Sequence, residues 1–375
     1  MTGAVIVGYA RSAFHFAGKG SLAKTRPNDL AAAVIKGLTA QTGIKVDDIE
    51  DLLLGCAFPE GEQGMNVARL IGFIAGLPQS VGAATINRYC GSSMQAVHSA
   101  AGAIAMGAGD VFVCAGVESM SRVPMMGFNP MPNPQLAEQM PNAYVSMGIT
   151  AENLAQKYAI TREAQEAFAV ASHAKAAKAR AAGKFKDEII AMPAAGEDGC
   201  IRPDSNAAAL ADLKPAFKQQ GMVTAGTSSP LTDGAAACLV VSADYAMKHQ
   251  LPILAKIKSV AVAGCAPDIM GIGPVAATRK ALNRAGLSIN DIDIIEMNEA
   301  FAVQAMACLR DLNIDMARVN IDGGALALGH PLGATGVRII GKAASLLKRE
   351  KKKYALATQC IGGGQGIATI LEAVG

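Results

Sequence analysis

Short apolar runs alternate along the chain with longer, alanine-rich stretches in which apolar residues recur every three or four positions. The first pattern predicts buried strands and the second predicts amphipathic helices. The first strand is expected over residues 1–8, and helices over residues 29–41, 92–106, 161–182 and 274–285. Strands that alternate with helices in this way predict an α/β fold, in which helices cover a central sheet.

The pattern repeats itself within the chain. The segment GIKVDDI at 43–49 resembles GLSINDI at 286–292, which lies 243 residues further along, and an Ala-Phe pair recurs at the same offset. The pairs Ile-Asn at 86–87 and Val-Asn at 319–320 each precede a glycine-rich turn, and both halves close with an apolar strand. Such self-similarity predicts two related α/β halves. Chance likeness between two short helix-strand segments is the alternative.

A segment of different character separates the halves. Residues 124–141 hold five of the 16 prolines together with several methionines. A long segment without regular structure inside a compact chain is commonly functional. Exposed methionines would suit an adaptable apolar surface for an acyl chain or a partner subunit, although a passive surface loop fits the composition equally well. We expect the region from here to about residue 230 to be an insertion in the first half.

Composition and charge exclude several classes of protein. With 51% hydrophobic and 17% charged residues the chain is globular rather than disordered. A net charge of +3 is too small for a nucleic-acid-binding protein, and the basic run over residues 348–353 is typical of a solvated helix end. The weakly polar stretch at about 99–117 contains Asp110 and many small residues, so we expect no membrane span.

The eight cysteines are widely and irregularly spaced. The chain shows no signal peptide and no peroxisomal address, so we expect a reduced, cytoplasmic protein without a disulfide framework. It also has no CxxC pair and no His/Cys cluster with metal-ligand spacing. We therefore expect no metal site.

Cys90 lies in the segment NRYCGSSMQ, where an apolar strand ends and a helix begins. Backbone N–H groups at a helix N-terminus favour the thiolate and can stabilise an oxyanion. This placement after a strand and before a helix fits an activated nucleophile. A small cysteine that merely fills the core is the competing interpretation.

Three further segments carry candidate polar groups. His330, one of only five histidines, lies in GGALALGHPLG, where it could take a thiol proton or polarise a carbonyl; a structural histidine is the alternative. Cys360 opens CIGGGQG directly after a strand, and Asn298 opens NEAF at another strand end. The glycine cluster lacks the lysine and the spacing of a phosphate cradle. The glycine cluster can instead be interpreted as a loop whose backbone N–H groups face a reacting oxygen.

Together these four segments resemble the thiolase family, and they follow one another in the order found there. The likeness extends through GVESM, MGITAEN and TDGAA and covers almost the whole chain. It implies two duplicated βαβαβαββ halves that form a layered αβαβα sandwich, with an inserted loop domain. The implied domains are residues 1–118 plus 231–253 for the N-terminal half, 119–230 for the insertion, which would bind CoA and make oligomer contacts, and 254–375 for the C-terminal half.

The resemblance also implies a role for each motif. Cys90 would take the acyl group as a thioester, and His330 would accept the thiol proton and later return one. Cys360 would protonate the acetyl-CoA enolate in degradation, or abstract the methyl proton of acetyl-CoA in synthesis. Asn298, through a bound water, and His330 would stabilise the enolate oxygen. The backbone N–H groups of Cys90 and Gly362 would stabilise the acyl thioester oxygen. No cofactor is implied, because coenzyme A is a substrate.

Four further positions match residues that bind CoA in the family. Ser229 matches the serine that faces the pantetheine arm, and Arg202 matches a basic residue near the adenine. Phe217 and Met147 match apolar wall positions. A solvated surface arginine is the competing interpretation of Arg202.

Several departures from the family pattern bear on substrate and assembly. Ser93 stands where many relatives have Gly, and Ser146 and Pro230 stand where short-chain biosynthetic thiolases commonly have His and Gly. The stretch over residues 119–145 is shorter than in the tetrameric relatives. These differences favour a degradative 3-ketoacyl-CoA thiolase of fatty-acid β-oxidation. They leave open whether the expected homodimer assembles further into a tetramer.

We therefore expect an acyltransferase that transfers an acyl group between CoA and a 3-ketoacyl-CoA and releases acetyl-CoA. One alternative is an acetyl-CoA C-acetyltransferase that condenses two acetyl-CoA to acetoacetyl-CoA. Another is a non-catalytic acyl-CoA-binding subunit, and a ketoacyl synthase would place two histidines opposite its cysteine. The expected partners are CoA thioesters, a second copy of the chain and a β-oxidation enzyme complex. Acyl chain length, reaction direction and pathway context stay open.

Overall fold

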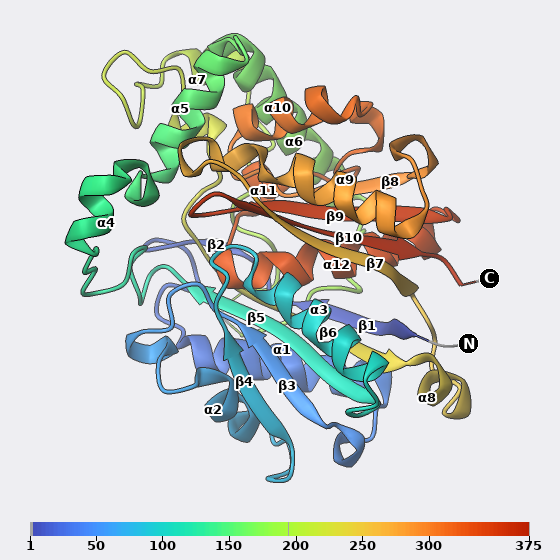
Figure 1. Ribbon diagram of the computed structural model, residues 1–375. Coiled ribbons are helices and arrows are strands. Elements are labelled where there is room, and N and C mark those ends of the chain that lie inside the picture. The colour runs from blue at the N-terminus through green and yellow to red at the C-terminus, as the bar shows by residue number, and fades with distance from the viewer. Residues whose placement is uncertain (1–2, 194, 375) are drawn as a thin grey trace.

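The computed structural model describes residues 3–193 and 195–374, which form two similar halves and an insertion (Figure 1). The first half contains β1 (Ala4–Arg11), β2 (His15–Phe16), α1 (Pro27–Thr42), β3 (Asp51–Gly55), α2 (Val67–Ile74), β4 (Gly82–Ile86), α3 (Ser92–Ala105), β5 (Val111–Ser119), β6 (Thr232–Ser242) and α8 (Ala243–Lys248). Between β5 and β6 lie α4 (Pro134–Gln139), α5 (Met147–Lys157), α6 (Arg162–Ala181) and α7 (Ala207–Ala211). The second half contains β7 (Ala255–Gly264), α9 (Gly273–Ala285), β8 (Ile294–Met297), α10 (Ala302–Leu312), α11 (Ala325–Leu328), α12 (Leu332–Arg349), β9 (Tyr354–Ile361) and β10 (Gln365–Glu372).

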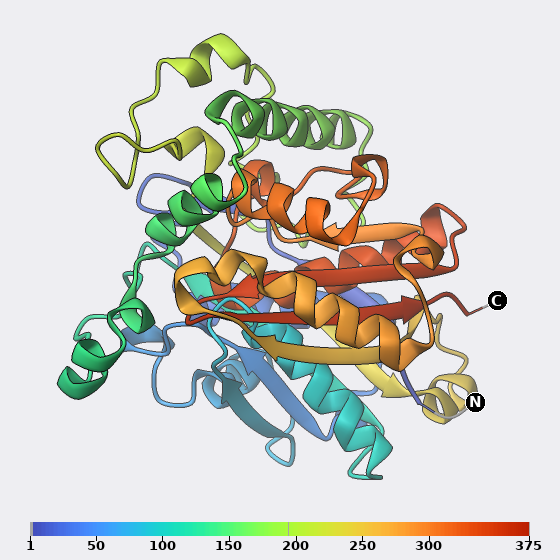
Figure 2. The same ribbon diagram turned by 45° about the horizontal axis from the view of Figure 1, so that its top comes forward.

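The helices and sheets of the described residues stack in alternating layers (Figure 1, Figure 2). An outer core joins α1 and α2 to the first sheet, and a second outer core joins α9 and α10 to the second sheet. Between the sheets, α3 and α12 share a central core with strands of both halves. The order of the layers is therefore αβαβα, as the family resemblance implies.

The strand order is the same in both halves. The first sheet runs β4-β3-β5-β6-β1 and the second runs β7-β10-β9-β8, and they are joined where Val5 and Ile6 of β1 pair with β7. In the first half β3 pairs in parallel with β4 and β5, and in the second half β8 pairs in parallel with β9. The last two strands of each half, β5 with β6 and β9 with β10, pair antiparallel. A bridge from Ile295 to Val319 takes the place of a counterpart to β4 in the second half. The predicted duplication is confirmed.

The local structure explains why the repeat is visible in the sequence. Helix α1 ends at Gly43 with φ +65° and α9 ends at Gly286 with φ +66°, and this left-handed conformation is one that glycine adopts without strain. A short 3₁₀ helix follows each of them and leads into β3 or β8. The four predicted helices correspond to α1, α3, α6 and α9, and Thr161 caps α6 by accepting a hydrogen bond from the Ala164 N–H at 3.3 Å.

The insertion lies outside the two sheets, and α4 projects from the rest of the molecule (Figure 1). Its proline-rich segment exposes Met125, Phe128 and Met131, the last of which is 82% exposed. The expected exposure of these methionines is thus observed. The domain boundaries proposed from the sequence, and the CoA-binding and oligomer roles of residues 119–230, stay predictions.

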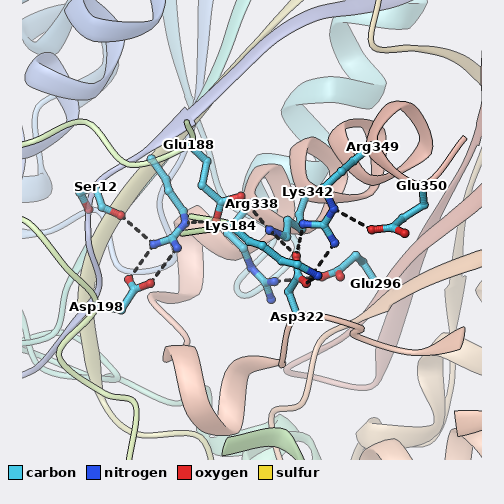
Figure 3. A network of polar contacts seen from close by, with 11 residues as sticks. Ser12, Lys184, Glu188, Asp198, Glu296, Asp322, Arg338, Lys342, Arg349 and Glu350 are labelled. Atoms are coloured by element: carbon cyan, nitrogen blue, oxygen red, sulfur yellow. Dashed lines mark hydrogen bonds and ion pairs between the residues drawn. The ribbon is translucent and has the colours of Figure 1, made fainter. Parts of the chain in front are cut away.

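A buried network of charged groups fastens part of this insertion to the sheet and to α12 (Figure 3). Arg11 of β1 contacts Asp198 at 2.7 Å and Glu188 at 2.8 Å, and Lys342 of α12 contacts Glu188 at 3.0 Å and Asp322 at 2.9 Å. Buried charges are costly unless they are paired. The pairing therefore favours one arrangement of the insertion against the core.

No helix among the described residues combines the length and the apolar character needed to cross a membrane.

The close crossing of α3 and α12 yields a stability prediction. A Cβ on Gly336 of α12 would come within 2.3 Å of the Met94 backbone nitrogen on α3. We expect Gly336→Ala to lower the free energy of unfolding by about 1–3 kcal/mol, because the core cannot accept the extra methyl group without shifting. Gly102→Ala is the matched control, since nothing lies within 4 Å of that exposed helical position, and it should raise stability by about 0.5–1 kcal/mol. Urea denaturation measures both, and equal stability of the two variants would contradict the packing argument.

Candidate active site

Cys90 lies in a tight turn between β4 and α3, as the sequence predicts. Tyr89 takes a left-handed conformation with φ +44°, which is strained for a residue with a side chain. The turn is held because the Ser92 backbone N–H donates to the Tyr89 carbonyl at 3.1 Å and the Gly91 N–H donates to the Arg88 carbonyl at 2.9 Å. This hydrogen-bonded turn therefore places Cys90 immediately before the N-terminus of α3.

The end of β9 and the loop after it supply two of the predicted groups. The backbone N–H of Gly362 faces the Cys90 sulfur, where it favours the thiolate, while burial acts in the opposite direction and raises the pKa of Cys90 to about 11. Cys360 is buried, and burial together with the nearby Cys90 thiol raises the pKa of Cys360 well above its usual value. Gln359 donates a hydrogen bond to the Cys90 carbonyl. The turn that contains Cys90 and the end of β9 are therefore in direct contact.

Asn298 and His330 meet at the end of β8. The Asn298 side-chain nitrogen lies 3.3 Å from His330 Nε2, and the Asn298 backbone N–H donates to the Thr358 carbonyl of β9 at 3.0 Å. Within the described residues, Asn298 Oδ1 is buried without a hydrogen-bond partner. Because β8 and β9 are paired, this amide and imidazole lie at the same sheet end as Cys360.

His330 is held in a neutral state. It is only 4% exposed, and burial, helped by Arg338, lowers its pKa to about 3. Its backbone N–H donates to Thr232 Oγ1 at 3.0 Å, and its Nδ1 lies 2.6 Å from Thr335 Oγ1. A neutral imidazole can accept a proton from a thiol, which fits a general base.

The candidate CoA residues fall into two groups. Met147 lies beside Gly362, since a Cβ added to Gly362 would be 3.6 Å from the Met147 sulfur. The rings of Phe217 and Phe301 pack edge to face, with their centres 5.9 Å apart. Ser229 also lies near this end of β8, because its N–H donates to the Ala300 carbonyl at 2.9 Å. These three residues border the region that contains Cys360.

Arg202 is placed apart from them. Its side chain is exposed and its guanidinium lies 5.2 Å from the centre of the Phe16 ring. Together with His173 and Ser228 it lines a shallow pocket. Both interpretations of this arginine, a CoA contact and a solvated side chain, are compatible with that position.

Sequence reasoning did not single out several residues that support the site. Thr335 contacts the His330 ring. Glu118 accepts hydrogen bonds from the backbone N–H groups of Ala57 and Gly333, both at 2.8 Å. Glu299 accepts from the Ser172 hydroxyl at 2.7 Å, and so joins the insertion to the β8 end. Both glutamates lie in motifs that the sequence analysis quoted, GVESM and NEAF, but a motif does not show which groups its carboxylate contacts.

Ser93, one of the departures from the family pattern, packs between two helices. Its hydroxyl accepts a hydrogen bond from the Val337 N–H of α12 at 2.9 Å, and the residue is fully buried. Ser93 therefore belongs to the contact between α3 and α12.

Across the described residues, no group of three or more His, Cys, Asp or Glu side chains is placed to hold a metal ion.

Comparison with known proteins finds relatives that match this chain over almost its whole length. The sequence model of the thiolase N-terminal domain matches residues 4–244, and that of the thiolase C-terminal domain matches residues 251–373. The 3-ketoacyl-CoA thiolase of Bacillus subtilis is 47% identical, with 99% of this chain and 100% of that protein covered. The 3-ketoacyl-CoA thiolase of Saccharophagus degradans is 48% identical, with 99% and 98% covered. The crystal structure of human mitochondrial 3-ketoacyl-CoA thiolase in complex with CoA matches with a TM-score of 0.93 at 36% identity, covering 100% of this chain and 98% of that one.

The raised pKa of Cys90 predicts how the thiol reacts in the resting protein. With a pKa of about 11, roughly one thiol in 10,000 is ionised at pH 7. Alkylation of Cys90 by iodoacetamide should therefore accelerate about tenfold per pH unit between pH 7 and pH 10, since the thiolate is the reacting form. Peptide mass spectrometry locates the adduct, with Cys90→Ala as the blank. A rate that levels off below pH 8 would instead indicate a resting thiolate–imidazolium pair.

Proposed function

This chain belongs to the thiolase family of acyltransferases, and on that premise we propose that it is a degradative 3-ketoacyl-CoA thiolase. It would transfer the acyl group of a 3-ketoacyl-CoA to CoA and release acetyl-CoA. The observation that carries the proposal is the meeting of Cys90, Cys360 and the Gly362 N–H at one sheet end beside the Asn298–His330 pair. Full-length likeness to proteins named 3-ketoacyl-CoA thiolase supports the substrate class.

The first half-reaction forms an acyl-enzyme. Cys90 loses its proton to His330 and its sulfur attacks the 3-keto carbon of the substrate. The bond between carbons 2 and 3 breaks, and its electron pair forms the enolate of acetyl-CoA. The Cys360 thiol protonates carbon 2, so acetyl-CoA leaves while the shortened acyl group stays on Cys90. At this point His330 holds the proton from Cys90, and Cys360 is a thiolate.

The second half-reaction restores the enzyme. The Cys360 thiolate takes the proton of the CoA thiol, and the CoA sulfur attacks the acyl carbon on Cys90. The Cys90 sulfur leaves and recovers its proton from His330. All protons are returned, so the cycle closes without a cofactor.

Two separate sets of donors would stabilise the negative oxygens of these steps. The Gly362 N–H, which faces the Cys90 sulfur, and the Cys90 N–H suit the oxygen of the acyl thioester. The protonated His330 ring, with a water held by Asn298, suits the enolate oxygen. The unpartnered Oδ1 of Asn298 supports this assignment. Such preorganised donors are commonly the largest contribution to catalysis.

The assembly and location of the protein belong to the same proposal. The outer edge of β4 has no partner strand in the described part of the chain, and Met65 and Phe73 beside it are 89% and 49% exposed. An uncovered edge with apolar neighbours favours pairing with a second copy, and so supports a homodimer. The exposed proline-rich segment would suit contacts with a further copy or with another β-oxidation enzyme, and the expected compartment is the cytoplasm.

The acyl-enzyme gives a direct test of the reaction. Mixing the protein with acetoacetyl-CoA or with a medium-chain 3-ketoacyl-CoA should add to Cys90 an acyl group two carbons shorter than the substrate's. Intact-protein and peptide mass spectrometry identify the group and its site, and Cys265→Ser serves as a control at a partly exposed thiol. Absence of any adduct would support a binding subunit. A strict preference for the four-carbon substrate would support the acetoacetyl-CoA-forming alternative.

The separate role of Cys360 can be tested independently. Cys360→Ser should lower kcat for thiolysis by about 10²- to 10⁴-fold, the usual contribution of a positioned acid or base. Acetylation of Cys90 by acetyl-CoA should slow by no more than about tenfold, because in that step Cys360 gives its proton to the CoA sulfur and not to carbon, and a thiolate is a good leaving group without an acid. Stopped-flow thiolysis and mass spectrometry of the acetyl-enzyme measure the two rates. An equal loss of both would show that Cys360 does not act on the carbon centre.

A further inference from the structure

The two ring nitrogens of His330 lie in different surroundings. Nδ1 is 2.6 Å from Thr335 Oγ1, whereas Nε2 is 3.3 Å from the side-chain nitrogen of Asn298. A neutral imidazole carries its proton on only one nitrogen, and the partner of the other nitrogen decides which one. The function of a base at this position therefore depends on these two contacts.

The hydroxyl of Thr335 is already committed as a donor. Thr335 lies in the first turn of α12, and its Oγ1 donates to the Pro331 carbonyl at 3.0 Å, a contact that Thr makes readily with the residue four positions earlier. A hydroxyl has a single hydrogen, so towards His330 the Thr335 oxygen can only accept. The contacts of Thr335 with Pro331 and with His330 are therefore satisfied together only when the imidazole proton is on Nδ1.

The second contact agrees with this assignment. The Asn298 amide nitrogen is a donor and cannot accept a hydrogen bond. Nε2 faces this nitrogen and forms a hydrogen bond with it only when it carries a lone pair. The two contacts of the ring are satisfied together by the tautomer with Nδ1 protonated and Nε2 free.

We propose that Thr335 is a positioning residue that holds His330 in the Nδ1–H tautomer, so that Nε2 is the atom that takes the proton of Cys90. This inference rests on the proposed thiolase reaction. The opposite tautomer would present an N–H to the thiol and could not act as a base until its proton moved. Within the buried site, the Thr335 hydroxyl prevents that arrangement.

The surrounding structure leaves the ring little freedom to turn away from Thr335. The His330 backbone N–H is bound by Thr232 Oγ1 at 3.0 Å. Gly329 before it has φ +101°, and a Cβ at Gly329 would come within 2.7 Å of the Thr232 side chain. On the other side, the Gly333 N–H is held by Glu118 at 2.8 Å. The backbone is fixed on both sides of the histidine, so the hydroxyl of Thr335 is what remains to select the proton position.

The test compares three variants of similar size. Thr335→Val removes the hydroxyl and keeps the shape, and Thr335→Ser keeps the hydroxyl. Thr369→Val is the matched control, because Thr369 Oγ1 contacts the Nε2 of another buried histidine, His98, at 2.8 Å, away from the groups assigned to the reaction. Nitrogen-15 NMR of labelled imidazoles reports the tautomer without reference to activity. Steady-state thiolysis gives kcat and KM.

We expect wild type to show His330 protonated on Nδ1. In Thr335→Val this signal should weaken, kcat should fall about tenfold or more, and KM for CoA should stay nearly constant, because part of a contribution of about 10²- to 10⁴-fold from the base is lost. Thr335→Ser should restore both the signal and kcat. Thr369→Val should change only the His98 signal and leave kcat as in wild type.

Other outcomes overturn the inference and can be told apart from failure of the proposed function. A wild-type His330 protonated on Nε2 overturns it even when no Thr335 variant folds. An active wild type whose Thr335→Val variant keeps full kcat also overturns it. A wild type that cleaves no 3-ketoacyl-CoA refutes the proposed reaction instead, while the NMR comparison still decides whether Thr335 sets the tautomer.

Discussion

Helix α12 is buried between the two sheets, and the other layers and the candidate site are arranged around it. Fifteen of its 18 residues are buried, so nearly every face of the helix meets another element. Small residues permit this closeness, since a Cβ on Gly116 of β5 would come within 2.2 Å of the Gly333 carbonyl at the start of α12. The same helix begins two residues after His330. Packing that fixes α12 therefore also fixes the backbone next to His330, so the stability of the core and the geometry of the candidate site depend on one helix.

A buried carboxylate connects this helix to the first half. Glu118, at the end of β5, accepts from the Gly333 N–H and from the Ala57 N–H in the loop after β3. Burial raises the pKa of Glu118, while these N–H groups act in the opposite direction. A carboxylate near a helix N-terminus is favoured by the helix dipole. Glu118 thus aligns the two halves at the end where both contribute groups to the site.

The electrostatics of the site favour a neutral resting state. Burial raises the pKa of Cys90 to about 11 and lowers that of His330 to about 3. A proton transfer between them creates two charges in a region of low dielectric, which is costly unless other groups stabilise them. The Gly362 N–H stabilises the charge on the sulfur. A bound substrate carbonyl would take up the negative charge as the sulfur attacks it. Ionisation is therefore coupled to the reaction, and the free enzyme avoids exposing a reactive thiolate.

The local elements, the duplication and the turn that holds Cys90 could be predicted from the sequence, because each depends on residues close together in the chain. The apolar spacing predicted α1, α3, α6 and α9, and the repeat that includes Gly43 and Gly286 predicted the two halves. Family resemblance then supplied the grouping of the cysteines, Asn298 and His330, which spacing alone leaves open. The folded chain, by contrast, brings Ser93 into a helix contact, joins the halves through Glu118, and places the Thr335 hydroxyl between the Pro331 carbonyl and the His330 ring. Those contacts depend on how the two sheets stack around α12, and no local pattern encodes the stacking.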